Sequence, residues 1–373
     1  MSEWNEYNLN EVYDFASGLS KGAEEFGFGT GFLGFTDVFK NFFVPNELTS
    51  LVNSTEKEQQ SCSIQRGDVF LTRTSETDED LGMSCVALKN YPKATFNGFT
   101  KRLRPNGNVE ILPEYAGFYF RSPKFRATVS GMSSITTRAS LNNSMLADLK
   151  IAVPKIEEQQ AIANTLLSLH SKIELLERQN VTLDKLGATF FRQWFIEEVK
   201  SDWEIKRLDD FFPVITGKKD ANFASENGLY QFFTCSQKSF RCDNYSFEGH
   251  SILLAGNGDF SVKRYNGKFD AYQRTYVLIP TEEKYVGFLY YLMQYFLDDI
   301  TMGGQGSVIS FLTKSMITDY EFPFPTDNYD DKFIEINNIN NKIDANKNQI
   351  ENLKKLRNSL SPKIFNHQIF VEI

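Results

Sequence analysis

The chain has 373 residues, which is more than one hydrophobic core ordinarily holds, so two or more domains are expected. Hydrophobic residues at 41% and charged residues at 24% indicate a globular protein, and a net charge of −8 argues against a uniformly basic nucleic-acid binder. No basic start precedes an apolar stretch, and no apolar run nears the roughly 20 residues of a membrane span. These features predict a cytoplasmic protein without a membrane partner.

The first segment, residues 1–155, is expected to form an α+β domain. Short β-branched and aromatic runs such as residues 68–72 are separated by Gly, Asn, Asp and Pro. Gly29, Gly31 and Gly34 have the spacing of a dinucleotide-binding loop, but residues 21–25 are polar where that motif needs an apolar strand, and Pro45 interrupts the helix that the motif requires next. We therefore expect no nucleotide site here.

A basic stretch lies inside this segment. Between Lys89 and Arg138 there are nine basic residues and only two acidic ones, Glu110 and Glu114. Such a stretch is usually a solvated face, and the aromatic residues among these charges belong mostly in a core. Neutralising phosphates is nevertheless what gives proteins affinity for nucleic acid, so we expect backbone-phosphate contact here. The residues predicted to contact DNA are Lys101, Arg102, Arg104, Arg121, Lys124, Arg126 and Arg138.

Residues 156–200 are predicted to form one long helix. Apolar residues recur three and four positions apart, with Asn180 as a polar interruption, which is a heptad stripe. A helix of forty residues would be roughly 60 Å long and could not bury this stripe on itself. The predicted contact positions are Ile162, Leu166, Leu169, Ile173, Leu176 and Leu183.

The second segment, residues 201–327, shows the same pattern of short strand-like runs as the first and is expected to form a second α+β domain. Residues 251–254 and 275–279 read as strands, and residues 286–297 as a helix. Acidic residues offset much of the basic charge here. Loops 256–258 and 303–306 are either ordinary turns or carriers of Asn257 and Gln305 to base edges, since Asn and Gln pair with adenine. The other residues predicted to contact DNA are Lys218, Lys219, Lys238, Arg241, Lys263, Arg264 and Arg274.

Residues 328–373 are predicted to form a second long helix of the same character. Its stripe includes Ile339, Ile343, Ile350 and Leu353. Because the two stripes match in length, we expect the helices to pair as an antiparallel coiled coil within the chain. The alternative is two surface helices packed on separate cores.

The chain repeats itself over about half its length. Met145, Asp148 and Pro154 recur with the same spacing as Met316, Asp319 and Pro325. Upstream, Trp4, Leu9 and Gly18 recur as Trp203, Leu208 and Gly217. This period is far above that of a solenoid. The predicted fold is therefore α+β, with two similar α/β domains separated by two long helices and related by a pseudo-twofold repeat.

Catalytic motifs are absent from the sequence. The four cysteines include no C-x-x-C pair and the three histidines are far apart, so we expect neither a metal site nor a thiol enzyme. There is no G-x-x-x-x-G-K-[ST] loop for ATP and no Asn/Asp-Pro-Pro-aromatic motif of a methyltransferase. Residues 282–284 are a meagre hint of a nuclease that a solvated turn explains.

The sequence resembles specificity subunits of Type I restriction–modification enzymes. Residues 153–163 are similar to the P-x-x-x-E-Q-x-x-I-A pattern that begins the central helix of that family, with Glu158 and Gln159 at the matching positions. Residues 35–40 and 303–310 resemble blocks of its target recognition domains. The second copy departs from the pattern, because residues 330–335 lack the Glu-Gln pair.

The resemblance implies a non-catalytic reader of double-stranded DNA, in which each domain binds half of a split target. Two methyltransferase subunits would dock on the helices and carry S-adenosylmethionine. Restriction subunits, where present, would bring ATP and Mg²⁺. A spacer between two similar domains independently suits half-sites about one DNA turn apart. The alternatives are a coiled-coil adaptor whose domains bind proteins, and a self-contained methyltransferase.

Overall fold

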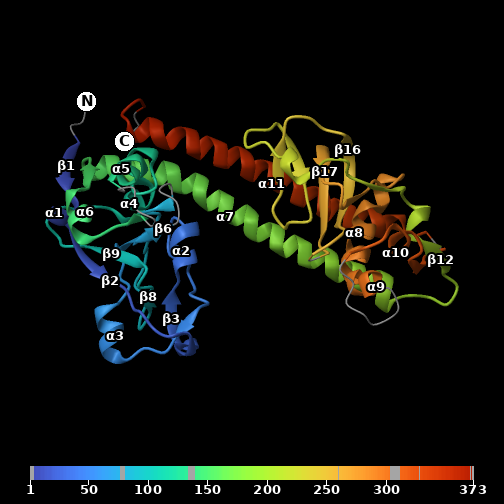
Figure 1. Cartoon of the computed structure of the whole chain (residues 1–373), viewed down its shortest axis with the longest axis horizontal. Coiled ribbons are helices and arrows are strands. Elements are labelled where there is room, and N and C mark those ends of the chain that lie inside the picture. Colours follow the sequence, from blue (N-terminus) through green and yellow to red (C-terminus); the bar gives the residue numbers. More distant parts are fainter. Residues whose placement is uncertain are drawn as a thin grey trace. The chain divides into compact units, whose positions relative to one another are not determined.

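The computed structural model describes residues 4–75, 80–132, 139–258, 260–302, 311–326, 328–369 and 371. The chain divides into two compact units, residues 1–173 with 352–373 and residues 174–351. Each unit holds one sheet domain and half of each of two long helices, α7 and α11 (Figure 1, green and red). The predicted boundaries at 155, 200 and 327 follow composition rather than contacts and stay a prediction.

The first unit begins with a strand and ends its sheet domain at the start of α7. Its elements are β1 (Asn5–Asn8), α1 (Leu9–Val12), β2 (Tyr13–Ser17), a 3₁₀ turn (Ala23–Glu25), β3 (Phe26–Leu33), α2 (Phe35–Lys40), β4 (Leu51–Val52), α3 (Glu56–Ser61), β5 (Val69–Thr72), β6 (Thr74–Ser75), β7 (Ser84–Val86), β8 (Thr95–Phe96), β9 (Thr100–Pro105), α4 (Pro113–Tyr119), α5 (Pro123–Met132), β10 (Ala139–Ser140), α6 (Asn143–Asp148), β11 (Lys150–Val153) and α7 (Ile156–Arg192).

In the second unit the sheet domain follows a five-residue π-helical turn (Gln193–Glu197) at the end of α7. Its elements are β12 (Glu204–Arg207), a 3₁₀ turn (Leu208–Asp210), β13 (Val214–Thr216), a second such turn (Ala221–Phe223), β14 (Tyr230–Phe233), β15 (Phe240–Cys242), β16 (Phe247–Ala255), β17 (Val262–Ala271), β18 (Thr275–Leu278), a third (Glu283–Tyr285), α8 (Val286–Tyr295), α9 (Leu297–Met302), α10 (Lys314–Thr318), β19 (Glu321–Phe324) and α11 (Asp330–Phe365).

Both sheet domains are built around the same three antiparallel strands. The first contains the order β2-β9-β5-β7 and the second the order β13-β18-β16-β17-β14-β15. The pairing register is also shared: Ser17 is opposite Lys101 and Thr72 opposite Thr100, as Thr216 is opposite Tyr276 and Ala255 opposite Thr275. Strands β5 and β18 are buried along their whole length, which places them in the cores. Strands β2, β9 and β5 of the first domain thus correspond to β13, β18 and β16 of the second, and we call this three-stranded arrangement the shared sheet.

The repeat seen in the sequence has a structural counterpart in each unit. The first strand of each domain pairs with its last, β1 with β11 and β12 with β19. The repeated methionines occupy equivalent capping positions, because Met145 donates its backbone N–H to the side chain of Asn142 and Met316 donates to Thr313. These short helices, α6 and α10, lead into the closing strand and then into the long helix. The repeat is thus one folding unit used twice.

The repeated glycines have a steric reason. A Cβ atom at Gly18 would lie 2.2 Å from the carbonyl oxygen of Asn97, and one at Gly217 would lie 2.1 Å from that of Ala271. Neither approach is possible for a real side chain. In each domain the backbone therefore passes too close to the segment just before β9 or β18 for any residue except glycine. This explains why glycine recurs at the same distance from the repeated Trp and Leu.

Helices α7 and α11 pack antiparallel in each unit, as predicted. In the first unit His170 contacts Arg357, and Ile162 lies in the same core as Ile364. In the second unit Asn180 accepts a hydrogen bond of 2.9 Å from Asn346, and the rings of Phe195 and Phe333 stack. Residue numbers rise along one helix as they fall along the other. All ten predicted contact positions are buried or partly buried.

The ends of both helices also belong to the domain cores, which the coiled-coil prediction did not include. Ile162, Leu166, Ile364 and Phe365 lie in the first domain's main core. Phe191, Phe195, Phe333 and Ile336 lie in the second's. The helices therefore combine the two arrangements that the sequence left open, with core packing at their ends and helix pairing between. Within the described ranges, no helix is long and apolar enough to cross a membrane.

Candidate nucleic-acid interface

Two basic residues of β9 point their charges into the first domain. Lys101 Nζ lies 2.9 Å from Ser17 Oγ and 2.8 Å from Asn143 Oδ1, and burial lowers the pKa of this amine. Arg102 donates to the carbonyl oxygen of Ser63 at 2.7 Å. Each residue is only 8% exposed. Both side chains are therefore used first to hold neighbouring segments together.

Arg104, the next basic residue of β9, forms a two-pronged ion pair. Its Nε and Nη2 donate to the two carboxylate oxygens of Asp68 at 2.7 and 2.6 Å, and Asp68 is completely buried. Nη2 also donates to the Ser63 carbonyl oxygen at 3.0 Å. Such planar pairing is the strongest geometry available to arginine. It neutralises a buried carboxylate rather than presenting charge to a ligand.

Arg121 braces the first domain from within. Its Nε donates to the carbonyl oxygen of Ser84 at 2.7 Å, and its Nη2 lies 2.8 Å from those of Val38, Phe39 and Asn41. Burial, together with nearby arginines, lowers the pKa of this guanidinium to about 10. One side chain thus satisfies four carbonyl groups from two segments that are far apart in the sequence.

Two further arginines flank this brace. Arg126 donates to the carbonyl oxygen of Leu81, and burial lowers the pKa of its guanidinium. Arg357 of α11 lies 4.5 Å from the centre of the Phe42 ring, whose other cation is Arg121 at 4.9 Å. Of the remaining predicted residues, Lys124 is half-buried, and Arg138 lies outside the described residues.

The second domain uses two of its predicted DNA contacts to hold α11. The Arg264 side chain, 4% exposed, pairs with both oxygens of Asp344 and donates to the Asn340 carbonyl oxygen at 3.1 Å. Arg241 pairs with Glu351 at 2.7 Å, but those side chains are 36% and 42% exposed. The first pair is largely desolvated and the second is open to water.

We expect Asp344→Ala to lower the free energy of unfolding by about 2–4 kcal/mol, because it leaves the Arg264 charge buried without its partner. Glu351→Ala, the matched control on the same helix, should cost at most about 1 kcal/mol, because its pair is solvated. Chemical denaturation of the two variants beside the wild type measures both. Equal losses would contradict the distinction.

The other predicted residues of the second domain are more open. Lys218, Lys238 and Arg274 are exposed, whereas Lys219 lies over the Phe223 ring at 4.5 Å. Lys263 Nζ donates to the carbonyl oxygens of Thr234 and Ser236. Asn257 forms an isolated antiparallel β-bridge with Phe311. Gln305 lies outside the described residues.

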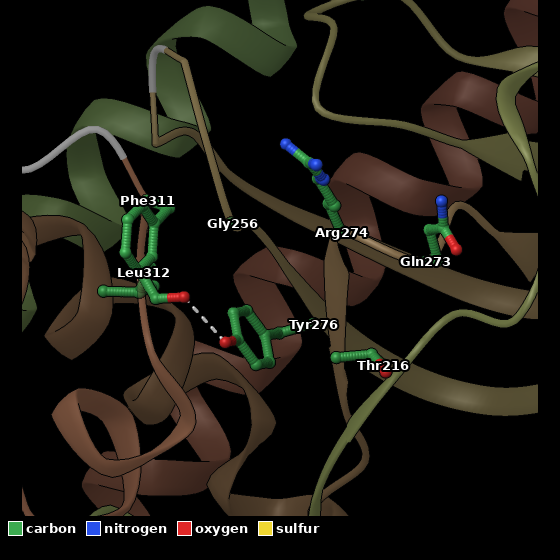
Figure 2. A pocket seen from close by; sticks show the side chains of 7 residues that line it. All are labelled: Thr216, Gly256, Gln273, Arg274, Tyr276, Phe311 and Leu312. Atoms are coloured by element: carbon green, nitrogen blue, oxygen red, sulfur yellow. Dashed lines mark hydrogen bonds between the residues drawn. The ribbon is translucent and has the colours of Figure 1, made fainter.

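A cavity of about 420 Å³ opens at the end of the shared sheet in the second domain. Figure 2 shows Phe311 and Leu312 on one side of it and Arg274 on the other, with the Tyr276 hydroxyl donating to the Leu312 carbonyl oxygen at 2.8 Å. The remaining lining residues are Thr216, Gly256 and Gln273. Of all these residues, the sequence predicted only Arg274 as a DNA contact.

Three residues that were not among the predicted DNA contacts are notable for their exposure. Phe99 and Phe311 are 63% and 62% exposed, and Arg73 is exposed at the end of β5. Phe99 follows a Gly in a turn, which is the kind of signal that could have found it. Arg73 and Phe311 can be placed at the end of the shared sheet only when the pairing of the strands is known.

The Glu-Gln pair at the start of α7 serves the fold. The Gln159 side chain accepts from the Leu112 backbone N–H at 2.9 Å and donates to the carbonyl oxygens of Glu110 and Pro154 at 3.0 Å. Glu158 accepts a hydrogen bond from the Trp4 indole at 3.1 Å. The pair therefore anchors the helix to the first domain.

Among the described residues no cluster of His, Cys, Asp or Glu could hold a metal ion, and Cys62, Cys85, Cys235 and Cys242 are free thiols. Gly29 and Gly31 lie within strand β3 rather than in a strand-to-helix turn. Two copies of a sheet domain on antiparallel helices, with basic side chains at the sheet ends, define a duplicated recognition protein.

The family model described as "Type I restriction modification DNA specificity domain" matches residues 1–185 and 200–356. The chain therefore belongs to this family, as the non-catalytic DNA specificity subunit of a Type I restriction–modification system.

Individual relatives agree with this. The EcoDI specificity subunit of Escherichia coli is 43% identical over 125 residues, which are 34% of this chain and 28% of that protein. The MjaIX specificity subunit of Methanocaldococcus jannaschii is 25% identical over 369 residues, covering 86% of this chain and 82% of that one. The solved S subunit from M. genitalium has the same fold, with a TM-score of 0.63 and 16% identity, covering 97% of this chain and 96% of that one.

Proposed function

We propose that this subunit reads a bipartite, asymmetric DNA target, with one half-site for each sheet domain. The observation that carries the proposal is the shared sheet, which has the same strand pairing in both domains but different side chains at matching positions. At the end of this sheet, Arg73 and Phe99 of the first domain stand where the second domain has Gly256 and Arg274. A common frame gives both domains the same approach to DNA, and different side chains give them different sequences to read.

The proposed contacts depend on exposure. Lys124, Lys218 and Lys238 have their side chains at least partly in solvent and are suited to phosphates. Arg274 is also exposed and lies at the end of the shared sheet. The arginines whose guanidinium groups are paired inside the protein contribute to DNA binding indirectly, because they hold the domain in its shape. They are Arg102, Arg104, Arg121, Arg126 and Arg264. This ranking by exposure refines the sequence prediction, which distinguished basic residues only by the net charge of their surroundings.

The proposal extends to partners that the resemblance implies. Two methyltransferase subunits dock on the paired helices and carry S-adenosylmethionine, and restriction subunits, where the system has them, carry ATP and Mg²⁺. This chain itself binds no cofactor and works in the cytoplasm on double-stranded DNA. The solvent-facing side of α7, with exposed Leu175, Val181 and Leu186, supports a docking role.

Exchanging residues 201–327 for the corresponding domain of another family member should change one half of the methylated sequence and leave the other half intact. The physical reason is that the first domain keeps its own sheet and core. Mapping adenine methylation in a host that carries the whole system measures this outcome. A motif in which both halves change, or a continuous palindrome, would refute the two-reader proposal.

The competing adaptor function makes a different prediction. A protein-binding adaptor would show no salt-dependent affinity for duplex DNA, whereas a reader that neutralises phosphates loses affinity steeply as salt rises. Titrating the assembled methyltransferase complex with duplex DNA at several salt concentrations separates the two.

A further inference from the structure

The end of the shared sheet forms the same local structure in both domains. In the first, the backbone N–H of Arg73 donates to the carbonyl oxygen of Phe99 at 2.8 Å, and that of Leu141 donates to the oxygen of Arg73 at 2.8 Å. Arg73 directly follows β5 and Phe99 directly precedes β9. Three segments distant in sequence thus meet at one point.

The second domain repeats these bonds with the same lengths. The N–H of Gly256 donates to the oxygen of Arg274 at 2.8 Å, and that of Leu312 donates to the oxygen of Gly256 at 2.8 Å. Gly256 therefore corresponds to Arg73, Arg274 to Phe99, and Leu312 to Leu141. The cavity of Figure 2 lies at this point.

Each domain places one exposed arginine and one exposed phenylalanine at this sheet end. In the first they are Arg73 and Phe99, and in the second Arg274 and Phe311. The two phenylalanines sit on different segments, yet their exposed fractions are nearly equal, 63% and 62%. Single exposed apolar residues are common on surfaces. Finding the same combination at the matching point of a duplicated domain, on non-matching segments, calls for a common ligand.

The chemistry of the pair fits the groove of duplex DNA. Arginine donates two parallel hydrogen bonds to the O6 and N7 of guanine, and a phenylalanine ring makes apolar contact with a thymine methyl group or inserts at a base step. A protein surface that docks a partner helix would be expected to show an apolar strip rather than one exposed ring and one solvated cation at the same sheet end.

We propose that the Arg73–Phe99 and Arg274–Phe311 pairs are the base-contacting elements of the two domains, each for its own half-site. This assignment rests on the proposed function. Neighbouring positions differ between the domains: Gly98 precedes Phe99, whereas Gln273, whose amide suits adenine, precedes Arg274. The second element therefore reads through more polar groups than the first, and the two half-sites differ.

The test uses the complete complex with methyltransferase subunits, after the wild-type target has been mapped. The variants Arg73→Ala and Phe99→Ala should each reduce discrimination at one half-site by about tenfold or more, measured as relative affinity for duplexes altered in one half. Arg274→Ala and Phe311→Ala should do the same at the other half only. Matched controls are Phe28→Ala and Leu229→Ala, which remove apolar residues that are 51% and 77% exposed elsewhere on the same domains.

Three outcomes would count against the assignment. Discrimination equal to that of the controls would overturn it while leaving the two-reader proposal intact. Weaker association with the methyltransferase subunits, with unchanged half-site discrimination in the complex that still forms, would show that these pairs dock a protein. A wild-type complex that recognises no bipartite sequence would instead overturn the proposed function. Thermal melting of each variant confirms that the domain has folded.

Discussion

Arg121→Ala is expected to lower the free energy of unfolding by about 3–5 kcal/mol, which is among the largest effects of any single substitution. The loss arises because four carbonyl groups lose their charged hydrogen-bond donor at the same time. They belong to Val38, Phe39, Asn41 and Ser84. A hydrogen bond to a charged group contributes about 1.5–3 kcal/mol, and bonds that share one side chain do not add fully. Denaturant unfolding of the purified chain measures the change.

Two companion variants separate a structural role from a role in DNA contact. Arg121→Lys should recover little of the stability, because an ammonium on a flexible stem does not reproduce the planar fork. Lys124→Ala, three residues away and half-buried, should leave stability within about 0.5 kcal/mol and weaken DNA binding across sequences. If Arg121→Ala unfolds like the wild type but binds DNA poorly, the brace interpretation is wrong.

Ile343→Asp is expected to cost several kcal/mol, about 3–5, because it places an unpaired carboxylate where the side chain is 5% exposed. Ile343 lies on the buried face of α11, one turn before Asn346, which donates to Asn180 of α7. Ile173→Asp on α7, where the side chain is 2% exposed, should be similarly damaging. The midpoint of thermal or denaturant unfolding measures both losses.

The control for this experiment lies on the same helix. Asn341→Asp introduces the same charge at an exposed position and should change stability by less than about 0.5 kcal/mol. Co-purification with the methyltransferase subunits supplies a second measurement, because the paired helices are the proposed docking site. If both isoleucine variants keep the wild-type unfolding midpoint and still assemble with the methyltransferase subunits, the pairing of α7 with α11 is wrong.

The order of domains and helices was predictable from the sequence by itself. Heptad periodicity is a local property, so the stripe containing Leu166 and Ile173 predicted a long helix whose apolar face needed a partner. The strands at residues 68–72 and 275–279 and the helix from residue 286 were also predicted from local composition, and β5, β18 and α8 lie there. Spacing shared between Trp4 and Trp203 established the duplication, because a repeat is visible without knowing any contact.

Whether each basic side chain faces the protein interior or the solvent was decided only by the tertiary structure. A count of basic residues does not distinguish Arg121, which caps carbonyl groups from a segment eighty residues away, from Arg73, which lies at the exposed end of the shared sheet. Whether a guanidinium faces protein or solvent depends on which unsatisfied acceptors the fold brings within about 3 Å, and long-range strand pairing sets those distances. For the same reason the matching positions of Phe99 and Arg274 appeared only when Arg73 and Gly256 were seen to donate to them.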